Sequence, residues 1–336
     1  MSAAPLIDCR DLSKVFRVYH REDGWRGLAK NFLRREYVEV PAVSGVSLQA
    51  HAGELIGLIG ANGAGKTTLV KCLTGIVPKT SGTATLFGTD CFELSDAEKR
   101  RLALVMGQRS QLWWDLPAID SFRLLREIYE VEESAFRSRL DAYAARLGVE
   151  EQLTLQLRQL SLGQRMKMEI IGAFLHAPEV VFLDEPTIGL DLPSREEIRR
   201  FLVELNKQSG VTVVLTSHDM EDIEETCKRL VILEKGGVLF DGDLVELHQR
   251  VVDERAVEVH LEPGSPGWEP AHESALAPFG ARLAKEGSLS LTFTVPTSST
   301  QGFVKALFDL YAVRDLAIER QPLEGLVREI FQGGAG

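Results

Sequence analysis

Long apolar segments are missing from this 336-residue sequence. The longest runs, such as residues 55–59 and 211–215, hold about five residues, whereas a membrane-spanning helix needs roughly 18 or more. The N-terminal stretch MSAAPLIDCRDLSKVF carries charges where a signal peptide would have its apolar core. We therefore expect a chain that stays in the cytoplasm and reaches a membrane only through a partner.

Cysteine and positive charge are scarce as well. The four cysteines, Cys9, Cys72, Cys91 and Cys227, lie far apart without CxxC spacing. This predicts reduced, mostly buried thiols rather than a disulfide framework or a zinc site. The 38 basic residues against 49 acidic ones give a formal net charge of −11, which argues against a broad nucleic-acid-binding face. With 44% hydrophobic residues the composition is that of a globular protein.

Short apolar runs alternate with longer helical patterns as far as about residue 245, which predicts an α/β domain with a mostly parallel sheet. The expected strands are residues 55–59, 180–183, 211–216 and 230–233. The stretch 121–160 lacks strand signals and has amphipathic helical spacing, which indicates a helical subdomain of about residues 115–165.

A composition shift after Leu247 predicts a boundary between a first domain, residues 1–247, and a small second domain, residues 248–336. In the second domain, residues 289–295 alternate as in a half-buried strand, and residues 302–311 have helical spacing. Residues 316–318 fit another strand, and Pro322 suits the first turn of a last helix. We expect a small α+β domain.

Residues 60–67 read GANGAGKT, a phosphate-binding loop between an expected strand and an expected helix. Glycines let the backbone wrap a polyphosphate, so that N–H groups and the helix N-terminus point at its charge. Lys66 should bridge the β- and γ-phosphates, and the Thr67 hydroxyl should bind Mg²⁺. A plain glycine-rich turn is the alternative, disfavoured by the lysine and threonine offsets. The expected contacts are Gly60, Ala61, Asn62, Gly63, Ala64, Gly65, Lys66, Thr67 and Thr68.

Residues 180–185 read VVFLDE, an apolar strand that ends in two carboxylates. Asp184 fits the partner of Mg²⁺, through water, and Glu185 fits the group that polarises the attacking water. The alternative is that both carboxylates only cap the next helix. It is weakened by the phosphate loop upstream, because ligands of such sheets bind at the carboxyl ends of the strands.

Residues 160–165, LSLGQR, resemble the signature sequence of ABC-type ATPases. The family's other motifs follow in order: Gln108 matches the Q-loop glutamine, residues 188–191 (IGLD) the D-loop, and residues 217–219 (SHD) the switch histidine. Tyr37, 29 residues before Lys66, stands where members place an adenine-stacking aromatic. The resemblance covers about residues 6–245 and departs from LSGGQ at Leu162.

This resemblance implies a P-loop NTPase fold, with a RecA-like core, an inserted helical subdomain and an antiparallel β edge. It implies that ATP and Mg²⁺ bind and that two copies pair head to tail. Ser161, Gly163, Gln164 and Asp191 of one copy would then close over the ATP held by the other. The catalytic residues would be Glu185, His218 and Gln108, and the residues that bind Mg²⁺ would be Thr67, Gln108 and Asp184.

Two further stretches have patterns typical of contacts with a membrane or with a membrane protein. Residues 20–36 form an insertion with the spacing of a basic amphipathic helix, which would lie on a membrane, on a permease or on its own domain. It resembles a helix of polysaccharide-exporting members. Trp113 and Trp114 are adjacent, so they cannot share one helical face. They would either dock the permease or be buried in the helical subdomain.

The stretch 104–117, LVMGQRSQLWWDLP, and the C-terminal stretch 315–331 resemble ATPases that pair with ABC-2-type permeases. The first hypothesis is therefore the ATP-hydrolysing subunit of such a transporter, with export as the direction, at the cytoplasmic face of the inner membrane. The alternatives are a soluble mechanical ABC ATPase and a nucleotide-binding regulatory module without turnover. We expect no nucleic-acid partner.

Overall fold

The computed structural model describes residues 4–19, 37–107, 109–251, 254–265 and 267–320. Its contacts divide the chain into two units, Met1–Gly242 and Asp243–Gly336, near the boundary expected after Leu247. Within the described residues, no helix is both long enough and apolar enough to span a bilayer. All four cysteines are free and buried, as the sequence predicts.

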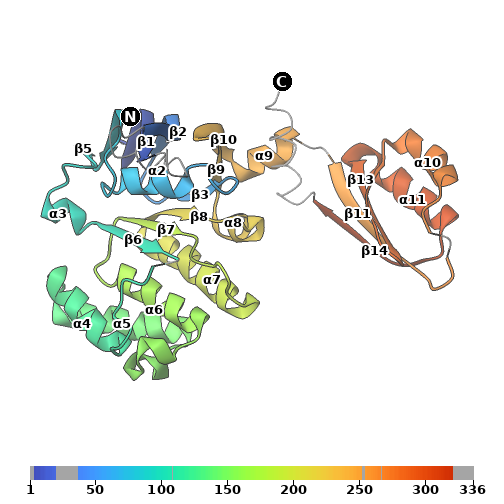
Figure 1. The fold of residues 1–336 in the computed structure, drawn as a ribbon. Helices are drawn as coiled ribbons and strands as arrows, with labels where there is room; N and C mark the ends of the chain where they lie inside the picture. Colours follow the sequence, from blue (N-terminus) through green and yellow to red (C-terminus); the bar gives the residue numbers. More distant parts are fainter. Residues whose placement is uncertain (1–3, 20–36, 108, 252–253, 266, 321–336) are drawn as a thin grey trace, which may run out of the picture. The chain divides into compact units, whose positions relative to one another are not determined.

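The core of the first unit is a six-stranded sheet in the order β10-β9-β3-β8-β7-β6 (Figure 1). The pairs joining β9, β3, β8, β7 and β6 are all parallel. Strands β3, β7 and β8 are buried along their whole length, which suits strands covered on both faces. The four expected strands are confirmed as β3 (Leu55–Ile59), β7 (Val180–Asp184), β8 (Thr212–Thr216) and β9 (Arg229–Glu234). Two further strands complete the sheet, β6 (Leu102–Met106) and β10 (Gly237–Asp243).

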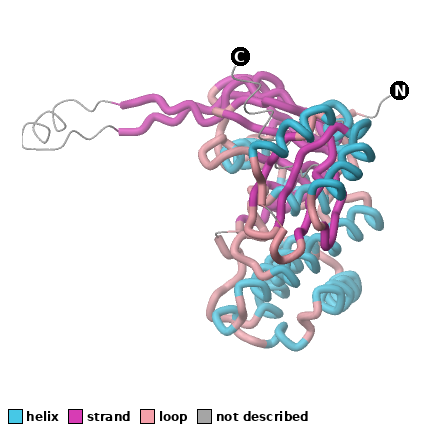
Figure 2. Tube along the Cα trace, turned by 90° about the vertical axis from the view of Figure 1, so that its right-hand side faces the viewer, coloured by secondary structure: helices cyan, strands magenta, loops and turns pink. Residues whose placement is uncertain are grey.

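A second, antiparallel sheet has the order β2-β1-β4-β5. Helix α2 (Lys66–Leu73) shares one apolar core with this sheet and the central one, in which Ile7, Ile56 and Leu69 are fully buried. The hairpin of β1 and β2 projects as a long arm (Figure 2). Its last register pair joins Tyr19 and Tyr37. The strands are β1 (Ile7–Tyr19), β2 (Tyr37–Ala50), β4 (Ser81–Leu86) and β5 (Thr89–Asp90).

The expected helical subdomain is present. Its helices are α4 (Ala118–Ile128), α5 (Glu133–Leu147) and α6 (Leu162–Phe174), with two short 3-10 turns, Glu151–Thr154 and Leu157–Gln159, before α6. Helix α6 begins at Leu162, because Ser161 and Gln164 form a reciprocal capping box at its N-terminus. The remaining helices of this unit are α3 (Asp96–Lys99), α7 (Leu192–Ser209) and α8 (Met220–Thr226).

The second unit is a small α+β domain. A β-α-β-β-α-β sequence forms an antiparallel sheet in the order β12-β13-β11-β14, with α10 and α11 on one face (Figure 1). Its core includes Phe293 and Phe303. The helix expected from Pro322 lies outside the described residues. The elements are α9 (Leu244–Val251), β11 (Glu254–Leu261), α10 (Pro270–Leu276), β12 (Arg282–Glu286), β13 (Ser290–Pro296), α11 (Thr300–Leu310) and β14 (Val313–Arg320), with 3-10 turns at Ala277–Phe279 and Thr297–Ser299.

Candidate functional site

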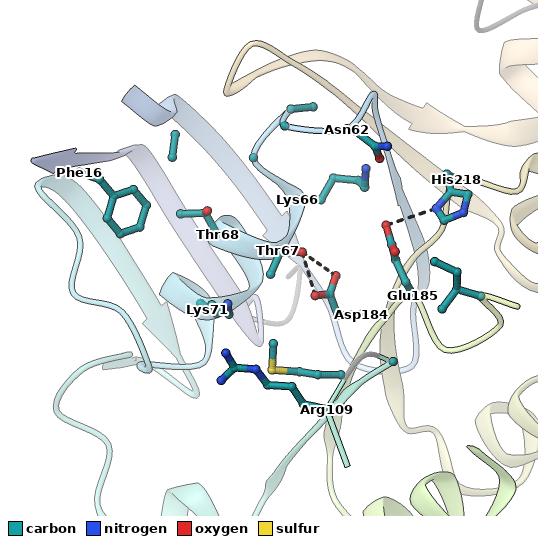
Figure 3. A pocket seen from close by; sticks show the side chains of 17 residues that line it. Phe16, Asn62, Lys66, Thr67, Thr68, Lys71, Arg109, Asp184, Glu185 and His218 are labelled. Atoms are coloured by element: carbon teal, nitrogen blue, oxygen red, sulfur yellow. Dashed lines mark hydrogen bonds and ion pairs between the residues drawn. The ribbon is translucent and has the colours of Figure 1, made fainter. Parts of the chain in front are cut away.

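A cavity of about 790 Å³ lies between the phosphate loop and the carboxyl ends of β6, β7 and β8 (Figure 3). Loop, strand ends and the following turns meet there because parallel strands end at one edge of a sheet. The sequence-predicted residues that line the cavity are Asn62, Gly63, Ala64, Gly65, Lys66, Thr67, Thr68, Asp184, Glu185 and His218. Residues from three separate segments are thus brought together.

The phosphate loop leads directly into α2. Gly65 caps this helix with a φ of 103°, and a Cβ there would lie 2.2 Å from the Ala42 carbonyl oxygen, so only glycine fits. The Lys66 Nζ donates hydrogen bonds to the carbonyl oxygens of Gly60 and Ala61, at 2.7 and 3.4 Å. Burial lowers the pKa of Lys66, and the nearby carboxylates act in the opposite direction. The loop therefore presents backbone N–H groups and the Lys66 ammonium group to one cavity.

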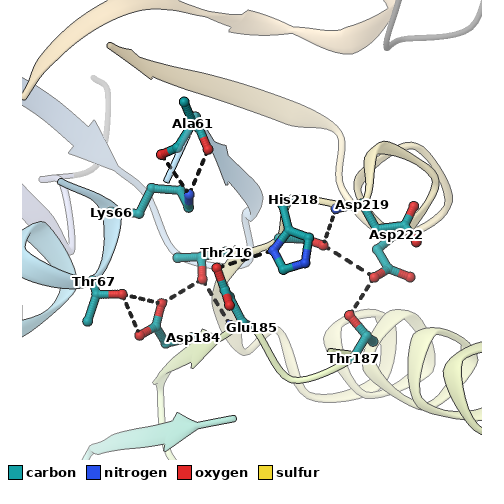
Figure 4. Close-up of polar contacts among 12 residues, drawn as sticks. Ala61, Lys66, Thr67, Asp184, Glu185, Thr187, Thr216, His218, Asp219 and Asp222 are labelled. Atoms are coloured by element: carbon teal, nitrogen blue, oxygen red, sulfur yellow. Dashed lines mark hydrogen bonds and ion pairs between the residues drawn. The ribbon is translucent and has the colours of Figure 1, made fainter. Parts of the chain in front are cut away.

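Asp184 ends β7 beside this loop (Figure 4). The Thr67 hydroxyl lies 2.8 Å from Asp184 Oδ2, and the Thr216 hydroxyl donates to Asp184 Oδ1 at 2.7 Å. Sequence reasoning missed Thr216, whose position depends on the pairing of β7 with β8. The helix-capping alternative is wrong, because the residue at the N-cap of α7 is Asp191.

Glu185 follows in an unusual backbone conformation, with a φ of 55°. Its N–H donates to the Thr216 hydroxyl at 2.9 Å, so the end of β8 holds this turn in place. Its Oε1 lies 3.3 Å from Nδ1 of His218. The Glu185 side chain is 18% exposed and that of His218 50% exposed. A carboxylate so oriented at the cavity wall can act as a general base.

Gln108 lies outside the described residues, but its neighbours are placed. Met106, Gly107 and Arg109 line the cavity. The Gly107 N–H donates to the Asp184 carbonyl oxygen at 2.8 Å, and a Cβ on Gly107 would lie 2.2 Å from the Glu185 carbonyl oxygen. Gly107 thus contacts the turn that carries both carboxylates, two residues before the Q-loop segment, which we define as residues 109–116.

The aromatic at the cavity is Phe16 rather than Tyr37. Tyr37 pairs with Tyr19 at the outer end of the β1–β2 hairpin, whereas Phe16 pairs with Val40 nearer the core. The insertion 20–36 lies between Phe16 and Lys66, so spacing counted back from Lys66 leads to Tyr37. The register of β1 brings Phe16 to the cavity, which makes this ring a second candidate for stacking beside Tyr37.

The signature residues do not line this cavity. Ser161 accepts a hydrogen bond from the Gln164 N–H at 3.2 Å, and Gln164 Oε1 accepts one from the Ser161 N–H at 3.0 Å. A Cβ on Gly163 would lie 2.5 Å from the Ser194 hydroxyl and 3.4 Å from Asp191 Oδ1, so the signature faces the start of α7. Leu162 is exposed. The signature residues and the phosphate-loop cavity therefore lie apart within one chain.

The residues present suit Mg²⁺. Thr67 and Asp184 supply only oxygen donors, a hydroxyl and a carboxylate 2.8 Å apart. Mg²⁺ prefers oxygen ligands, keeps several waters and is usually completed by substrate phosphates. These two side chains border the phosphate loop, where phosphate oxygens would complete such a coordination shell.

The two tryptophans of the Q-loop segment are partly exposed, Trp113 by 44% and Trp114 by 49%. The alternative that both indoles are buried is therefore wrong. Leu116 beside them is also exposed. The second membrane-related feature, the insertion 20–36, lies outside the described residues.

Comparison with known proteins agrees with this geometry. The family model described as ABC transporter matches residues 43–188. Nod factor export ATP-binding protein I of Cupriavidus pinatubonensis is 31% identical over 228 residues, 68% of this chain and 70% of that protein. ABC transporter ATP-binding protein NatA of Bacillus subtilis is 29% identical over 62% of this chain and 85% of its own length. Methionine import ATP-binding protein MetN of Geobacillus kaustophilus is 29% identical over 88% of this chain and 85% of its own length.

Solved structures show the same fold. An ATP-binding subunit of an ABC transporter superposes with a TM-score of 0.60 at 24% identity, covering 73% of this chain and 92% of that one. A bacterial ABC transporter cassette solved as a dimer gives a TM-score of 0.59 at 23% identity, covering 71% and 98%. With the phosphate loop, the paired carboxylates and the signature helix in place, the chain belongs to the ABC transporter family of ATP-binding proteins.

Proposed function

We propose that this chain is the ATP-hydrolysing subunit of an ABC-2-type membrane transporter that works in export. The observation that carries the hydrolytic part is the pair of Glu185 and His218, which lies at the wall of the phosphate-loop cavity with Nδ1 and Oε1 3.3 Å apart. In this proposal Glu185 polarises the attacking water and His218 orients it toward the γ-phosphate.

The other residues serve the same reaction. Lys66 and the loop N–H groups hold the β- and γ-phosphates, and Phe16 stacks on the adenine. Thr67, Asp184 and Gln108 hold Mg²⁺, which when bound would neutralise part of the phosphate charge. Ser161, Gly163, Gln164 and Asp191 act on the ATP of a second copy, because they lie away from the cavity of their own chain.

Coupling to a permease is the finer part of the proposal. Its support is the exposure of Trp113 and Trp114 and the resemblance of residues 104–117 to ATPases of ABC-2-type transporters. The names of relatives include both Nod factor export and methionine import. In our proposal the chain lies at the cytoplasmic face of the inner membrane, held there by permease subunits.

The first experiment is hydrolysis of ATP by the purified full-length chain with Mg²⁺, beside Lys66→Ala as the variant that loses phosphate binding. Release of phosphate by the wild type and its loss in Lys66→Ala are expected. The second is co-expression with a polytopic permease encoded by a neighbouring gene. Co-purification supports the transporter assignment, and failure of an ATP-hydrolysing chain to bind such a permease would favour a mechanical ATPase.

A further inference from the structure

The side chain of Glu169 connects the Q-loop segment to α6, the helix that begins at the signature residues. This residue lies in the middle of α6 and is only 7% exposed. Its carboxylate accepts hydrogen bonds from the Ser110 hydroxyl, from the Gln111 N–H at 3.1 Å and from the Leu112 N–H at 3.4 Å. A single buried side chain on α6 therefore satisfies three successive residues of the segment.

Further contacts fasten the same two parts. Arg165 precedes Glu169 by four residues, so both side chains lie on one face of α6. The Arg165 guanidinium carbon lies 4.7 Å from the ring centroid of Trp114. The Arg158 N–H, just before the signature, donates to the Trp114 carbonyl oxygen at 3.1 Å. The segment and the start of α6 are thus joined along several residues.

Just before the segment, Gly107 contacts the turn that carries Asp184 and Glu185. Gly107 donates its N–H to the Asp184 carbonyl oxygen at 2.8 Å, and Arg109 lines the nucleotide cavity. A continuous set of contacts therefore leads from the cavity, through residues 109–112, to the helix that begins at Ser161.

Burying a carboxylate costs free energy unless it is hydrogen-bonded, whereas a buried apolar side chain needs no such partners. Burial raises the pKa of the Glu169 carboxyl, and the hydrogen bonds from Ser110, Gln111 and Leu112 act in the opposite direction. Among the described residues, no lysine or arginine forms an ion pair with Glu169, so its burial depends on these hydrogen bonds.

We propose that Glu169 is a positioning residue that holds the signature Ser161 in a defined place relative to the Q-loop segment. Given the proposed hydrolysis of ATP between two copies, the nucleotide bound by one chain then sets the placement of the signature which that chain offers to the other. Glu169 itself touches neither nucleotide nor metal.

The test uses Glu169→Gln in the full-length chain, a change that keeps the side-chain size but turns one acceptor oxygen into a donor group. We expect kcat for ATP to fall at least tenfold while KM stays within twofold, since the phosphate loop is untouched. The matched control is Lys167→Gln, which neutralises a neighbouring buried charge on α6 whose partner is Glu197 of α7. Lys167→Gln should keep kcat within twofold of the wild-type value, at a melting temperature similar to that of Glu169→Gln.

A second readout does not depend on hydrolysis. With Trp25→Phe and Trp268→Phe, the remaining tryptophans, Trp113 and Trp114, report on the segment by fluorescence. ATP should change their emission in this background and leave it unchanged when Glu169→Gln is added. An equal emission change in both would overturn the positioning role, as would a kcat of Glu169→Gln within twofold of the wild type. Absence of hydrolysis by the wild type would instead refute the proposed function, and the emission test would still decide on Glu169.

Discussion

Nδ1 of His218 lies 3.3 Å from Oε1 of Glu185, and the two side chains come from the ends of neighbouring parallel strands, β8 and β7. The contact orients the carboxylate at the cavity wall, where a water attacking the γ-phosphate would need it. A carboxylate held by a partner in this way is the usual arrangement of a general base.

Replacing Glu185 by Gln should abolish turnover and preserve ATP binding. The amide cannot accept the proton of the water, whereas Lys66 and the loop N–H groups are unchanged. We expect a fall in kcat of at least about 100-fold, measured as phosphate release by the purified chain. Wild-type turnover in Glu185→Gln would move the role of general base to Asp184 or His218.

The chain should dimerise when ATP is bound. The signature residues Ser161 and Gly163 do not line their own cavity, so they find a phosphate only in a second copy, and the ligand links the two chains. Light scattering on Glu185→Gln should show a doubled mass with ATP and Mg²⁺. Lys66→Ala in the same background is the control and should stay monomeric. A monomer mass at saturating ATP would contradict a composite site.

Phe16 rather than Tyr37 should carry the adenine contact. Lys14 Nζ lies 5.0 Å from the centroid of the Phe16 ring, and Phe16 borders the cavity. Stacking of a base on an aromatic ring contributes about 1–3 kcal/mol, so Phe16→Ala should weaken ATP binding about tenfold or more in calorimetry. Tyr37→Ala should leave it unchanged, and inorganic triphosphate should bind both variants alike. The reverse pattern would return the assignment to Tyr37.

Truncating Trp113 and Trp114 to Ala should weaken docking rather than folding. Both indoles are partly exposed, and loss of apolar anchors at an interface costs about 2 kcal/mol or more of binding. Co-purification with the membrane partner should fall at least tenfold. Phe122, fully buried in the same subdomain, is the control: Phe122→Ala should cost about 3–5 kcal/mol of stability. An equal drop in melting temperature for the tryptophan variant would support a packing role instead.

His176 should make the chain sensitive to acid. Its ring stacks on Tyr129 with centroids 3.8 Å apart, and its Nε2 lies 3.2 Å from the Leu102 carbonyl oxygen. Its Nδ1 is buried and has no hydrogen-bond partner among the residues that the structure describes. Burial lowers the pKa of His176 to about 4. The unfolded chain binds this proton near pH 6.5 and the folded chain only near pH 4. The contribution of the neutral His176 ring to the free energy of unfolding is therefore complete above pH 6.5. It is lost as the pH falls to about 4.

The loss amounts to about 3 kcal/mol at the lower end of this range. Urea unfolding at several pH values, compared between the wild type and His176→Phe, measures it. Phe keeps a flat ring beside Tyr129 and cannot titrate, so its stability curve should be flatter between pH 6.5 and 4. Parallel curves for the two proteins would show that His176 does not titrate as stated.

What the sequence predicted correctly is what neighbouring residues encode. The strand before the phosphate loop and the VVFLDE strand each carry their signal within a few residues. Thr216 and Glu169 were missed because their partners, Asp184 and Ser110, are remote in the sequence and meet only through strand pairing or helix packing. Phe16 was missed because an insertion changes spacing along the chain but not the register of a hairpin.

The end of the β1–β2 hairpin is a place where the fold tolerates connections of different length. Tyr19 and Tyr37 are opposite each other, so the polypeptide leaves the sheet and re-enters it at adjacent positions. The entropic cost of joining two such positions grows only slowly with the length of the connection. A segment of different length or chemistry can therefore be exchanged between them while the phosphate loop keeps its geometry, and related ATPases can acquire different accessory segments there without redesigning their nucleotide chemistry.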